Sequence, residues 1–416
     1  MSSLGSPSPF FLAGKKAYQV ARSVRFNGDR ETNFQQFRRT GTSTVSTYTI
    51  SMWAKNCGVG TGVYRMLFSI GQENDANAAW NGLTDSDTMG FQGGNSTYST
   101  STRVFRDPSA WFHFLISVNS NNFTTYINGT SIKTGTIRSL DTSTNGIRIG
   151  INYGTSYPWD GYIADYYLID GQALTPSSFT ETNSETGQLV PKLYTGSFGT
   201  EGAHLKFEDN SGITATTLGK DSSGNGNNYT PSGDWSVSAG AGNDSLEDTP
   251  TNNFCTLNPI QFGQSNTSTV SFSNGNLDFS DSSTNNKTAV STFGLKSGKY
   301  YFELLSTNTG TYSIGMTDLE NNNGSFYRNN GSYSSSFGGG GTSGYASWTT
   351  NDVIGVAVDF DSGKIWYAKN NTWQSGDPST GNSPTNTFTT GLTLHSEIYT
   401  DNSSGTKSGS FNFGQR

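Results

Sequence analysis

Short runs in which apolar and polar residues alternate recur along most of the chain. Each has a period of two and is bounded by Gly, Asn, Asp or Pro, which is typical of strands that bury one face. In the first half these runs are YTISMWA (48–54), RMLFSIG (65–71), WFHFLISV (111–118), FTTYING (123–129), IRIGI (147–151) and GYIADYYLID (161–170). Only TPSSFTETN (175–183) reads as a short helix. The rhythm predicts a two-sheet sandwich over 23–235, with its core in 45–185 and an added strand near 203–209.

The same rhythm returns in the second half of the chain. Its runs are SNGNLDFS (273–280), GKYYFELLS (298–306), TYSIGMTD (311–318), DVIGVAVDFD (352–361), KIWYAKN (364–370), HSEIYTD (395–401) and GSFNFG (409–414). Ser362-Gly363 joins two of them as a tight two-residue hairpin connection. The stretch 236–258 is rich in Gly, Ser, Asn and Asp and indicates a linker. We therefore predict an all-β protein of two antiparallel β-sandwich (jelly-roll) domains in tandem, over 23–235 and 259–416.

The N-terminal residues 1–22 read as an arm. Pro7 and Pro9 disfavour a regular strand or helix, and Phe10, Phe11 and Leu12 form an apolar cluster with too few neighbours for a core of its own. The arm either packs over its own domain or docks onto another subunit. The apolar run is too short for a secretory signal, and no stretch approaches the ~20 apolar residues of a membrane span.

Composition excludes several classes of partner. The 416 residues carry 25 Lys and Arg against 32 Asp and Glu, a net charge of −7, without long runs of one sign. This charge pattern offers no basic footprint for nucleic acid or for an anionic membrane, so we expect neither as a partner. Cys57 and Cys255 are the only cysteines, and they could pair only if the fold brought them together.

Residues with the chemistry for catalysis do not fall into a catalytic pattern. A glycosidase needs two carboxylates across a sugar cleft, and the nearest match, Glu73 and Asp75 followed by Asn77, lacks the third acid of a glucanase strand. Three histidines, at 113, 204 and 395, lie within predicted strands without a nucleophile elbow. The GGGG run at 338–341 lacks the Lys of a phosphate loop. We expect no enzymatic activity.

One loop offers a candidate metal site. Asp221, Ser223 and Asn225, followed by Gly226, repeat the oxygen-ligand spacing and sharp glycine turn of calcium loops. The bidentate Glu at position twelve of such loops is missing, and the flanks are not helical. Calcium is the one candidate cofactor, with an ordinary polar turn as the alternative.

Two aromatic loops are candidates for ligand binding, because exposed rings stack on sugar faces while Asn and Asp bond hydroxyls. The loop NYGTSYPWDG (152–161) supplies Tyr153, Tyr157, Trp159 and Asp160. The segment 326–348 supplies Tyr327, Arg328, Tyr333 and Tyr345. The alternative is that these rings pack against neighbouring subunits.

Each half of the chain also resembles a known fold family. The order YTISMWAK, LFSIG, WFHFLISVNSNNFTTYINGTSI, IRIGINY and WDGYIADYYLIDGQALTPSSF resembles the concanavalin A-like jelly rolls of the laminin-G and pentraxin group. In the second half GKYYFELLS, YSIGMTD, DVIGVAVDFDSGKIWYAKNNTW and SFNFG resemble a SPRY (B30.2-like) domain. The first resemblance implies a jelly roll, and the second implies a bent two-sheet sandwich of a family that generally recognises partners through loops.

Markers along the whole chain resemble phage virion proteins, particularly those of marine cyanobacterial viruses. They are AYQVARSVRFN (17–27), FRDPSAWFHF (105–114), YLIDGQALTPSSFTETN (167–183), TLGKDSSGNGNNYTP (217–231), AGNDSLEDTPTN (241–252) and CTLNP (255–259). The resemblance implies a non-enzymatic component of the virion, either a tail fibre or a capsid decoration. It also implies that the protein is homo-oligomeric, is anchored to other virion proteins through Phe10, Phe11 and Leu12, and displays its domains to host surface glycans.

Two other functions stay open at this point. The protein could be purely architectural and cement capsid or tail subunits. It could also be a polysaccharide depolymerase, against which the missing acid pair argues. The sequence alone leaves undecided whether the protein sits on capsid or tail, which glycan it meets and how many copies assemble.

Overall fold

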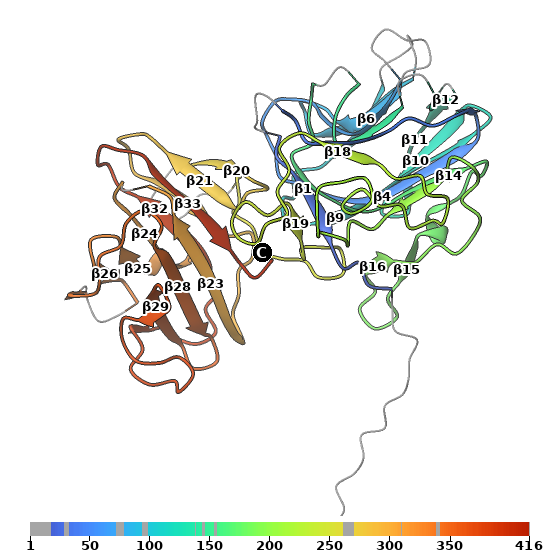
Figure 1. The fold of residues 1–416 in the computed structure, drawn as a ribbon. Helices are drawn as coiled ribbons and strands as arrows, with labels where there is room; N and C mark the ends of the chain where they lie inside the picture. Colours follow the sequence, from blue (N-terminus) through green and yellow to red (C-terminus); the bar gives the residue numbers. More distant parts are fainter. Residues whose placement is uncertain are drawn as a thin grey trace, which may run out of the picture.

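The computed structural model describes residues 18–28, 33–71, 79–93, 99–137, 139–143, 146–153, 156–260, 270–308, 310–337 and 342–415. It confirms the predicted fold class, two antiparallel β-sandwiches in tandem (Figure 1). In this part of the chain the sole helical element is the 3-10 turn η1 (Pro176–Ser178), and β15 (Thr180–Thr182) follows directly. The expected helix at 175–183 is therefore reduced to one turn, because Thr180–Thr182 pair with β16 (Leu189–Pro191) instead.

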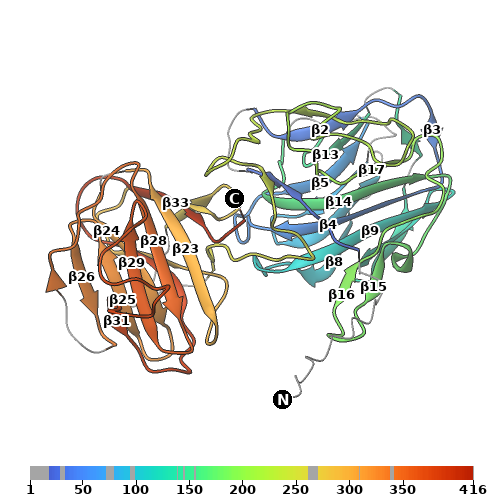
Figure 2. The ribbon, with the colours of Figure 1, turned by 60° about the horizontal axis from the view of Figure 1, so that its bottom comes forward.

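The first sandwich consists of an eight-stranded and a seven-stranded sheet. The eight-stranded sheet has the order β11 (Thr130–Thr136), β10 (Asn122–Ile127), β9 (Trp111–Asn119), β4 (Tyr48–Asn56), β14 (Gly161–Asp170), β1 (Ser23–Phe26) and β19 (Ser245–Leu246), with β17 (Ala203–Leu205) beside β14. The seven-stranded sheet has the order β18 (Thr230–Ser232), β2 (Gln36–Arg39), β13 (Ile147–Ile149), β5 (Arg65–Ile70), β6 (Ala79–Leu83), β7 (Thr88–Gly93) and β8 (Ser99–Val104). Two short strands, β3 (Thr44–Val45) and β12 (Leu140–Asp141), pair at the side. Figure 2 shows the two large sheets stacked on each other.

Alternation along the strands fills the first core. Ile50, Met52 and Ala54 of β4 face inward and pack with residues such as Phe68 of the opposite sheet. The outer face of β4 is buried as well, because residues 18–22 and the segment around β15 and β16 cover it. Val20 of this cover packs against Trp53 and Ala164. Thus the end of the predicted arm lies on its own domain, while Phe10, Phe11 and Leu12 lie outside the described residues.

The second sandwich pairs an eight-stranded sheet with a six-stranded one. The larger sheet has the order β20 (Ser271–Ser273), β21 (Asp278–Asp281), β33 (Lys407–Asn412), β23 (Lys299–Ser306), β28 (Val353–Asp359), β29 (Lys364–Lys369) and β30 (Thr372–Trp373), with β31 (Asn386–Thr387) beside β29. The smaller sheet has the order β22 (Lys287–Val290), β32 (His395–Thr400), β24 (Tyr312–Asp318), β25 (Asn323–Arg328), β26 (Ser332–Ser335) and β27 (Thr342–Ser343). Leu304, Val356 and Ile398 lie in the core that the two sheets enclose.

The hairpin between β28 and β29 was expected to turn at Ser362-Gly363 alone. The last paired residues are Asp359 and Lys364, so the connection is the four-residue segment 360–363. The Asp359 carboxylate accepts hydrogen bonds from the backbone N–H groups of Asp361 and Ser362, both at 3.1 Å, and this Asp turn sets the longer loop.

The stretch 236–258, expected to be a linker, is built into the first sandwich. Ser245–Leu246 form β19 beside β1, and two carboxylates of the stretch are buried against cations. Asp244 accepts Arg25 Nη2 at 3.0 Å, and Asp248 accepts Lys55 Nζ at 2.9 Å. The prediction of a linker was wrong because a polar, glycine-rich composition does not reveal which charged residues form ion pairs with residues far away in the sequence. We refer to residues 244–254 as the clasp segment.

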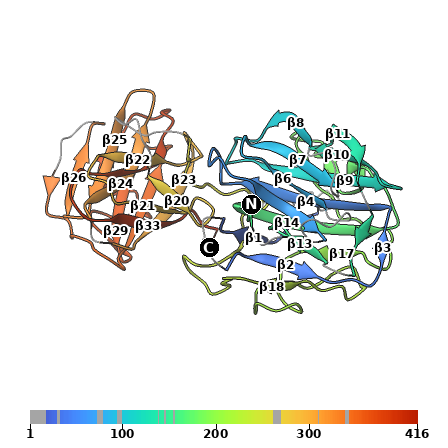
Figure 3. The same cartoon turned by 90° about the horizontal axis from the view of Figure 1, so that it is seen from above.

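The two sandwiches also touch directly through the turn between β20 and β21. Arg25 Nη1 donates to the carbonyl of Asn274 at 3.1 Å, and Tyr162 Oη donates to the carbonyl of Gly275 at 2.9 Å. Asn276 Nδ2 donates to the Cys57 carbonyl at 3.1 Å. Leu277 joins a small apolar cluster with Cys57 and Tyr162. Figure 3 shows the sandwiches side by side with the C-terminus at their junction.

A glycine substitution in this turn tests the contact. Gly275 has φ +65°, and an added Cβ would lie 2.6 Å from Tyr162 Oη. Gly60 has a similar φ of +72° with nothing within 4 Å, so Gly60→Ala is the matched control. Left-handed strain costs both variants about 1–2 kcal/mol, and overpacking adds about 1–3 kcal/mol for Gly275→Ala only. Urea unfolding, together with the radius of gyration by small-angle scattering, measures the difference. Equal stability and unchanged dimensions for both variants would contradict the described contact.

Candidate functional site

The outward face of the larger sheet in the second sandwich carries the candidate site. Strand register aligns its outward residues in rows across β23, β28 and β29. The first row is Lys299, Asp359 and Lys364, the second is Tyr301, Ala357 and Trp366, and the third is Glu303, Gly355 and Ala368, continued by Trp373 of β30. Two large rings thus flank a small residue in the middle row. A groove of about 360 Å³ lies here, which we call the outer groove.

Small residues let the rings lie down on the sheet. The Tyr301 hydroxyl reaches over Gly355, where a Cβ would come within 2.6 Å of it. The Tyr301 ring then meets Trp373 edge-on, with centroids 6.2 Å apart. Tyr301 is 46% exposed and Trp373 is half-buried, so both present ring surface to solvent. Rings held in this way lose little conformational freedom when a ligand stacks on them.

Polar groups at the rim of the outer groove are fixed by partners. Tyr301 Oη donates to Glu303 Oε1 at 2.8 Å, and Lys299 Nζ lies 3.2 Å from Asp359 Oδ2. Burial raises the pKa of Tyr301, and the bond to Glu303 raises it further, so the phenol stays protonated and can donate. Burial would also raise the pKa of Asp359, but hydrogen bonds from Ser362 and Lys299 outweigh it and lower the pKa.

The loop after β30 closes one end of the outer groove. Trp366 Nε1 donates to the carbonyl of Asn382 at 3.0 Å, and Lys364 Nζ donates to the carbonyl of Gly381 at 2.8 Å. Pro378 of this loop lines the outer groove beside Trp366. The result is an open, ring-lined trough with paired charges at its rim. Such a surface can stack on the apolar face of a flat polar molecule and bond its hydroxyls.

Sequence reasoning missed this site because its residues lie within strands and not on loops. A signal was present in the alternation. Outward positions of half-buried strands are normally polar, whereas Tyr301 and Trp366 occupy outward positions next to the small residues Gly355 and Ala357. Large rings beside small residues at these positions indicate a surface that is kept for something to lie on.

The loop predicted to bind ligands in the first sandwich is divided by the fold. Trp159 is fully buried in the core and Asp160 is buried, so neither can contact a ligand, and their expected role is wrong. Tyr153 is half-buried, and Tyr157 is 46% exposed. Tyr157 packs against Tyr64 with ring centroids 5.4 Å apart and is the most exposed of the three rings of this loop.

The second predicted loop is mostly core. Tyr327 and Tyr333 pack in the second core beside Tyr367, since they lie at inward positions of β25 and β26. Their expected role in ligand binding is therefore wrong. Arg328 and Tyr345 are half-buried and stay candidates by exposure alone.

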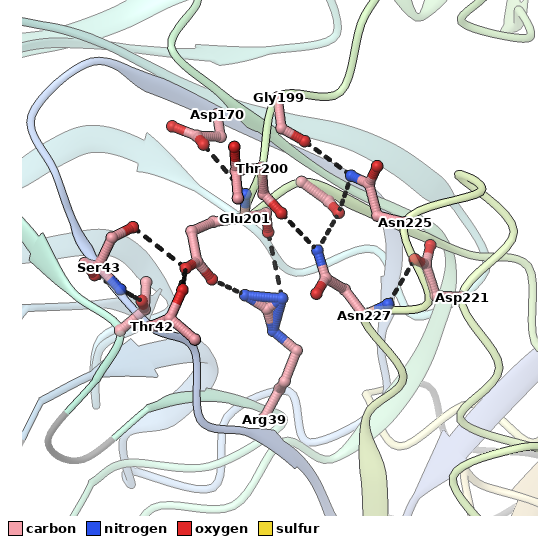
Figure 4. Close-up of polar contacts among 12 residues, drawn as sticks. Arg39, Thr42, Ser43, Asp170, Gly199, Thr200, Glu201, Asp221, Asn225 and Asn227 are labelled. Atoms are coloured by element: carbon pink, nitrogen blue, oxygen red, sulfur yellow. Dashed lines mark hydrogen bonds and ion pairs between the residues drawn. The ribbon is translucent and has the colours of Figure 1, made fainter.

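The predicted calcium loop is closed by its own hydrogen bonds. Asp221 Oδ1 accepts the backbone N–H groups of His204 and Ser223 at 2.9 and 2.8 Å, and Oδ2 accepts Ser223 Oγ and the Asn227 N–H, both at 2.8 Å. Asn225 Nδ2 donates to the carbonyls of Gly199 and Gly202, so its amide ties this loop to the next (Figure 4). The Asp221 oxygens that a cation would need already accept hydrogen bonds from donors of the protein. Calcium binding at this loop stays a prediction.

Figure 4 also shows a buried ion pair beside this loop. Glu201 binds Arg39 and accepts the backbone N–H and hydroxyl of Thr42 at 2.8 and 2.7 Å, with Ser43 Oγ at 3.1 Å. Burial would raise the pKa of Glu201, but these hydrogen bonds and Arg39 lower it. Both oxygens of the Glu201 carboxylate therefore already have partners, and these contacts hold the loop at 199–202 in place. Within the described ranges, no three His, Cys, Asp or Glu side chains converge as metal ligands would.

The groups suited to catalysis are also engaged in the structure. His113 is fully buried, more deeply than the half-buried position expected, and its Nε2 lies 2.8 Å from Ser51 Oγ. His204 Nε2 lies 2.8 Å from Asp165 Oδ1, and both side chains are buried. The candidates Glu73, Asp75 and Asn77 and the run at 338–341 lie outside the described residues.

Among the described residues no helix has the length and apolar character to cross a bilayer.

Acid sensitivity follows from the buried histidine. Burial lowers the pKa of His113 to about 3, so the folded state keeps the ring neutral while the unfolded chain protonates it below pH ~6.5. Its contribution to stability is therefore present above pH ~6.5 and is lost as the pH falls toward 3. Between pH 6.5 and 5 the free energy of unfolding of the wild-type protein should fall by about 2 kcal/mol more than that of His113→Gln. His395→Gln is the control, and the urea midpoint at each pH is the measurement. If the urea midpoint of His113→Gln changed with pH as that of the wild-type protein does, the acid sensitivity could not be assigned to His113.

A comparison with protein families agrees with this architecture. The family model described as "Concanavalin A-like lectin/glucanases superfamily" matches residues 29–178, less than half of the chain. The part of the first sandwich over residues 29–178 is therefore similar to the concanavalin A-like jelly rolls. No curated protein matches the sequence.

Several solved structures are similar to parts of the chain. A pentraxin of Limulus polyphemus is 19% identical, with 38% of this chain and 80% of that chain covered and a TM-score of 0.31. The SPRY domain of human HERC1 is 16% identical, with 34% and 90% covered and a TM-score of 0.26. Domain 4 of an extracellular arabinanase from Geobacillus stearothermophilus, in complex with arabinotriose, is 22% identical, with 37% and 73% covered and a TM-score of 0.30. These are likenesses of fold at low identity.

Proposed function

We propose that this protein binds carbohydrate without cleaving it and that the outer groove of the second sandwich holds the sugar. The observation that carries the proposal is the pair of rings on the groove. Tyr301, which is 46% exposed, lies beside the small residues Ala357 and Gly355 and meets the half-buried Trp373. Trp366 is buried under the loop after β30 and forms part of the floor without offering a ring face. A pyranose ring has an apolar face that stacks on such rings and equatorial hydroxyls that reach the rim. The family model of the first sandwich, named for lectins and glucanases, supports the same ligand class.

The charges at the rim favour a neutral sugar. Lys299 and Lys364 stand in these rows with Asp359 and Glu303, so the charges of the rows balance and give no excess of positive charge for a sulfate or carboxylate substituent. Lys299 is paired with Asp359, and Lys364 donates to the Gly381 carbonyl. The chain as a whole carries a net charge of −7, which disfavours a polyanion further. A single shallow groove gives weak affinity, so we propose that several copies act together and gain strength from avidity.

We further propose that this binding serves attachment of a phage virion to host surface glycans, with other virion proteins as partners. The support is the resemblance of the sequence markers between residues 17 and 259 to virion proteins. The binding-only role is supported by the ion pairs of the first sandwich, in which Asp87, Glu201, Asp244 and Asp248 are each held by a cation. A purified particle analysed by mass spectrometry tests the setting, since the proposal requires this chain among the structural proteins. If this chain is absent from the particle, the proposed virion role is wrong, and the sugar site is then tested by glycan binding alone.

A glycan array tests the ligand. Wild-type protein should bind neutral glycans, and Tyr301→Ala or Trp373→Ala should weaken binding about 2- to 13-fold each, because each ring contributes about 0.5–1.5 kcal/mol beyond its buried area. Ala357→Leu, which fills the floor of the outer groove without removing a ring, should abolish it.

The matched control for this test is Tyr157→Ala, which removes an equally exposed tyrosine from the first sandwich. Its binding should stay at the wild-type level. Loss of binding in Tyr157→Ala with retention in Tyr301→Ala would move the site to the first sandwich. Absence of any glycan signal from the wild type would contradict the proposed function.

A further inference from the structure

A second cavity lies in the second sandwich, next to the outer groove, with which it shares the lining residues Tyr300, Tyr301 and Val358. It has a volume of about 250 Å³. We call it the inner pocket. Residues of the larger sheet, such as Phe302 and Val358, line one side, and Met316 of β24 and Leu394, just before β32, line the other.

Nearly half of the lining residues are aromatic. Their rings are those of Phe254, Phe293, Tyr300, Tyr301, Phe302, Phe360 and Phe413. Tyr300 lies at the mouth, 45% exposed, with its ring edge-on to Phe360 at 5.9 Å. Rings around a cavity favour a flat aromatic occupant, which they contact face-on and edge-on. A cavity of about 150 Å³ admits benzene, so the inner pocket has room for a larger ring system.

One buried hydroxyl in the inner pocket lacks a partner. Ser396 is 4% exposed, and its Oγ makes no hydrogen bond within the described structure. Its neighbour Ser291 is satisfied, since Ser291 Oγ donates to the Phe293 carbonyl at 2.9 Å and accepts the Ser396 N–H at 3.0 Å. A buried hydroxyl without a partner is unfavourable, and a ligand with one polar group would remove this cost by bonding to it.

We infer that the inner pocket binds a small neutral aromatic molecule with a single hydrogen-bonding group, of the size of a phenol or an indole. The ring fills the space among the phenylalanines, and its N–H or O–H donates to Ser396 Oγ. This inference does not depend on the proposed sugar site. Tyr300, Tyr301 and Val358 line both cavities, but Ser396 and Met316 line only the inner pocket, and Ala357 and Trp373 line only the outer groove.

The inner pocket also depends on the joint between the sandwiches. One wall is formed by Asn253, Phe254 and Cys255. Lys55 of the first sandwich holds this wall, since its Nζ donates to Asn253 Oδ1 and to the Phe254 carbonyl, both at 2.9 Å. The cavity is thus complete only while the clasp segment is docked, and ligand binding should stabilise the docked arrangement.

Calorimetric titration with indole tests the inference. Wild-type protein should bind indole at one site per chain and should bind cyclohexanol, which has a hydroxyl but no aromatic ring, more weakly. Ser396→Ala should weaken indole binding about three- to tenfold, the worth of one hydrogen bond. Met316→Trp, which fills the cavity, should abolish binding while the melting temperature shows that the chain still folds.

Controls separate this site from other effects. Ser245→Ala removes another buried serine hydroxyl without a hydrogen-bond partner, in the first sandwich, and should leave indole binding unchanged. Ala357→Leu on the outer face should also leave it unchanged, so a failure of the sugar site is distinguishable. No indole binding by the wild type up to the solubility limit, or equal binding by Met316→Trp, would overturn the inference.

Discussion

Two buried ion pairs hold this molecule together, one between Arg25 and Asp244 and one between Lys55 and Asp248. All four side chains are almost fully withdrawn from water. Breaking such a pair leaves an unpartnered buried charge at a cost of about 3–5 kcal/mol, which explains why the clasp segment keeps one position. Lys55 Nζ has three acceptors, and Arg25 bonds both Asp244 and the turn of the second sandwich. The same two cations therefore fix the clasp segment and the joint.

The position of both cavities follows from this arrangement. The inner pocket takes one wall from the clasp segment, so its shape depends on a cation in the other sandwich. The outer groove depends on β23, β28, β29, β30 and the loop after β30, and on the small residues that let the Tyr301 ring lie flat. The protein thus combines one surface that belongs to a single sheet with one cavity that belongs to the pair of sandwiches.

The fold class could be predicted from the sequence because alternation of apolar residues is a local signal, and strands such as β4, β9, β14, β28 and β29 lie where it indicated. The joint could not, since Asp244 and Asp248 find partners about two hundred residues away, which no local pattern reveals. The prediction of the ligand-binding residues was wrong for a related reason. Tyr327 and Tyr333 stand in a polar, glycine-rich stretch that reads as a loop, yet they occupy inward strand positions. Exposure of a ring depends on which face of a strand it occupies.

The account stands on the clasp segment being part of the folded core, and amide hydrogen exchange measures this directly. Peptides covering residues 244–256 should be protected to a degree similar to those of β1 and β14, since β19 pairs in the same sheet. They should lose that protection in Lys55→Met while peptides from β28 keep theirs. Exchange at the rate of an unstructured chain in the wild-type protein would contradict the account, because the joint, the inner pocket and the fixed arrangement of the two sandwiches would then have nothing to hold them.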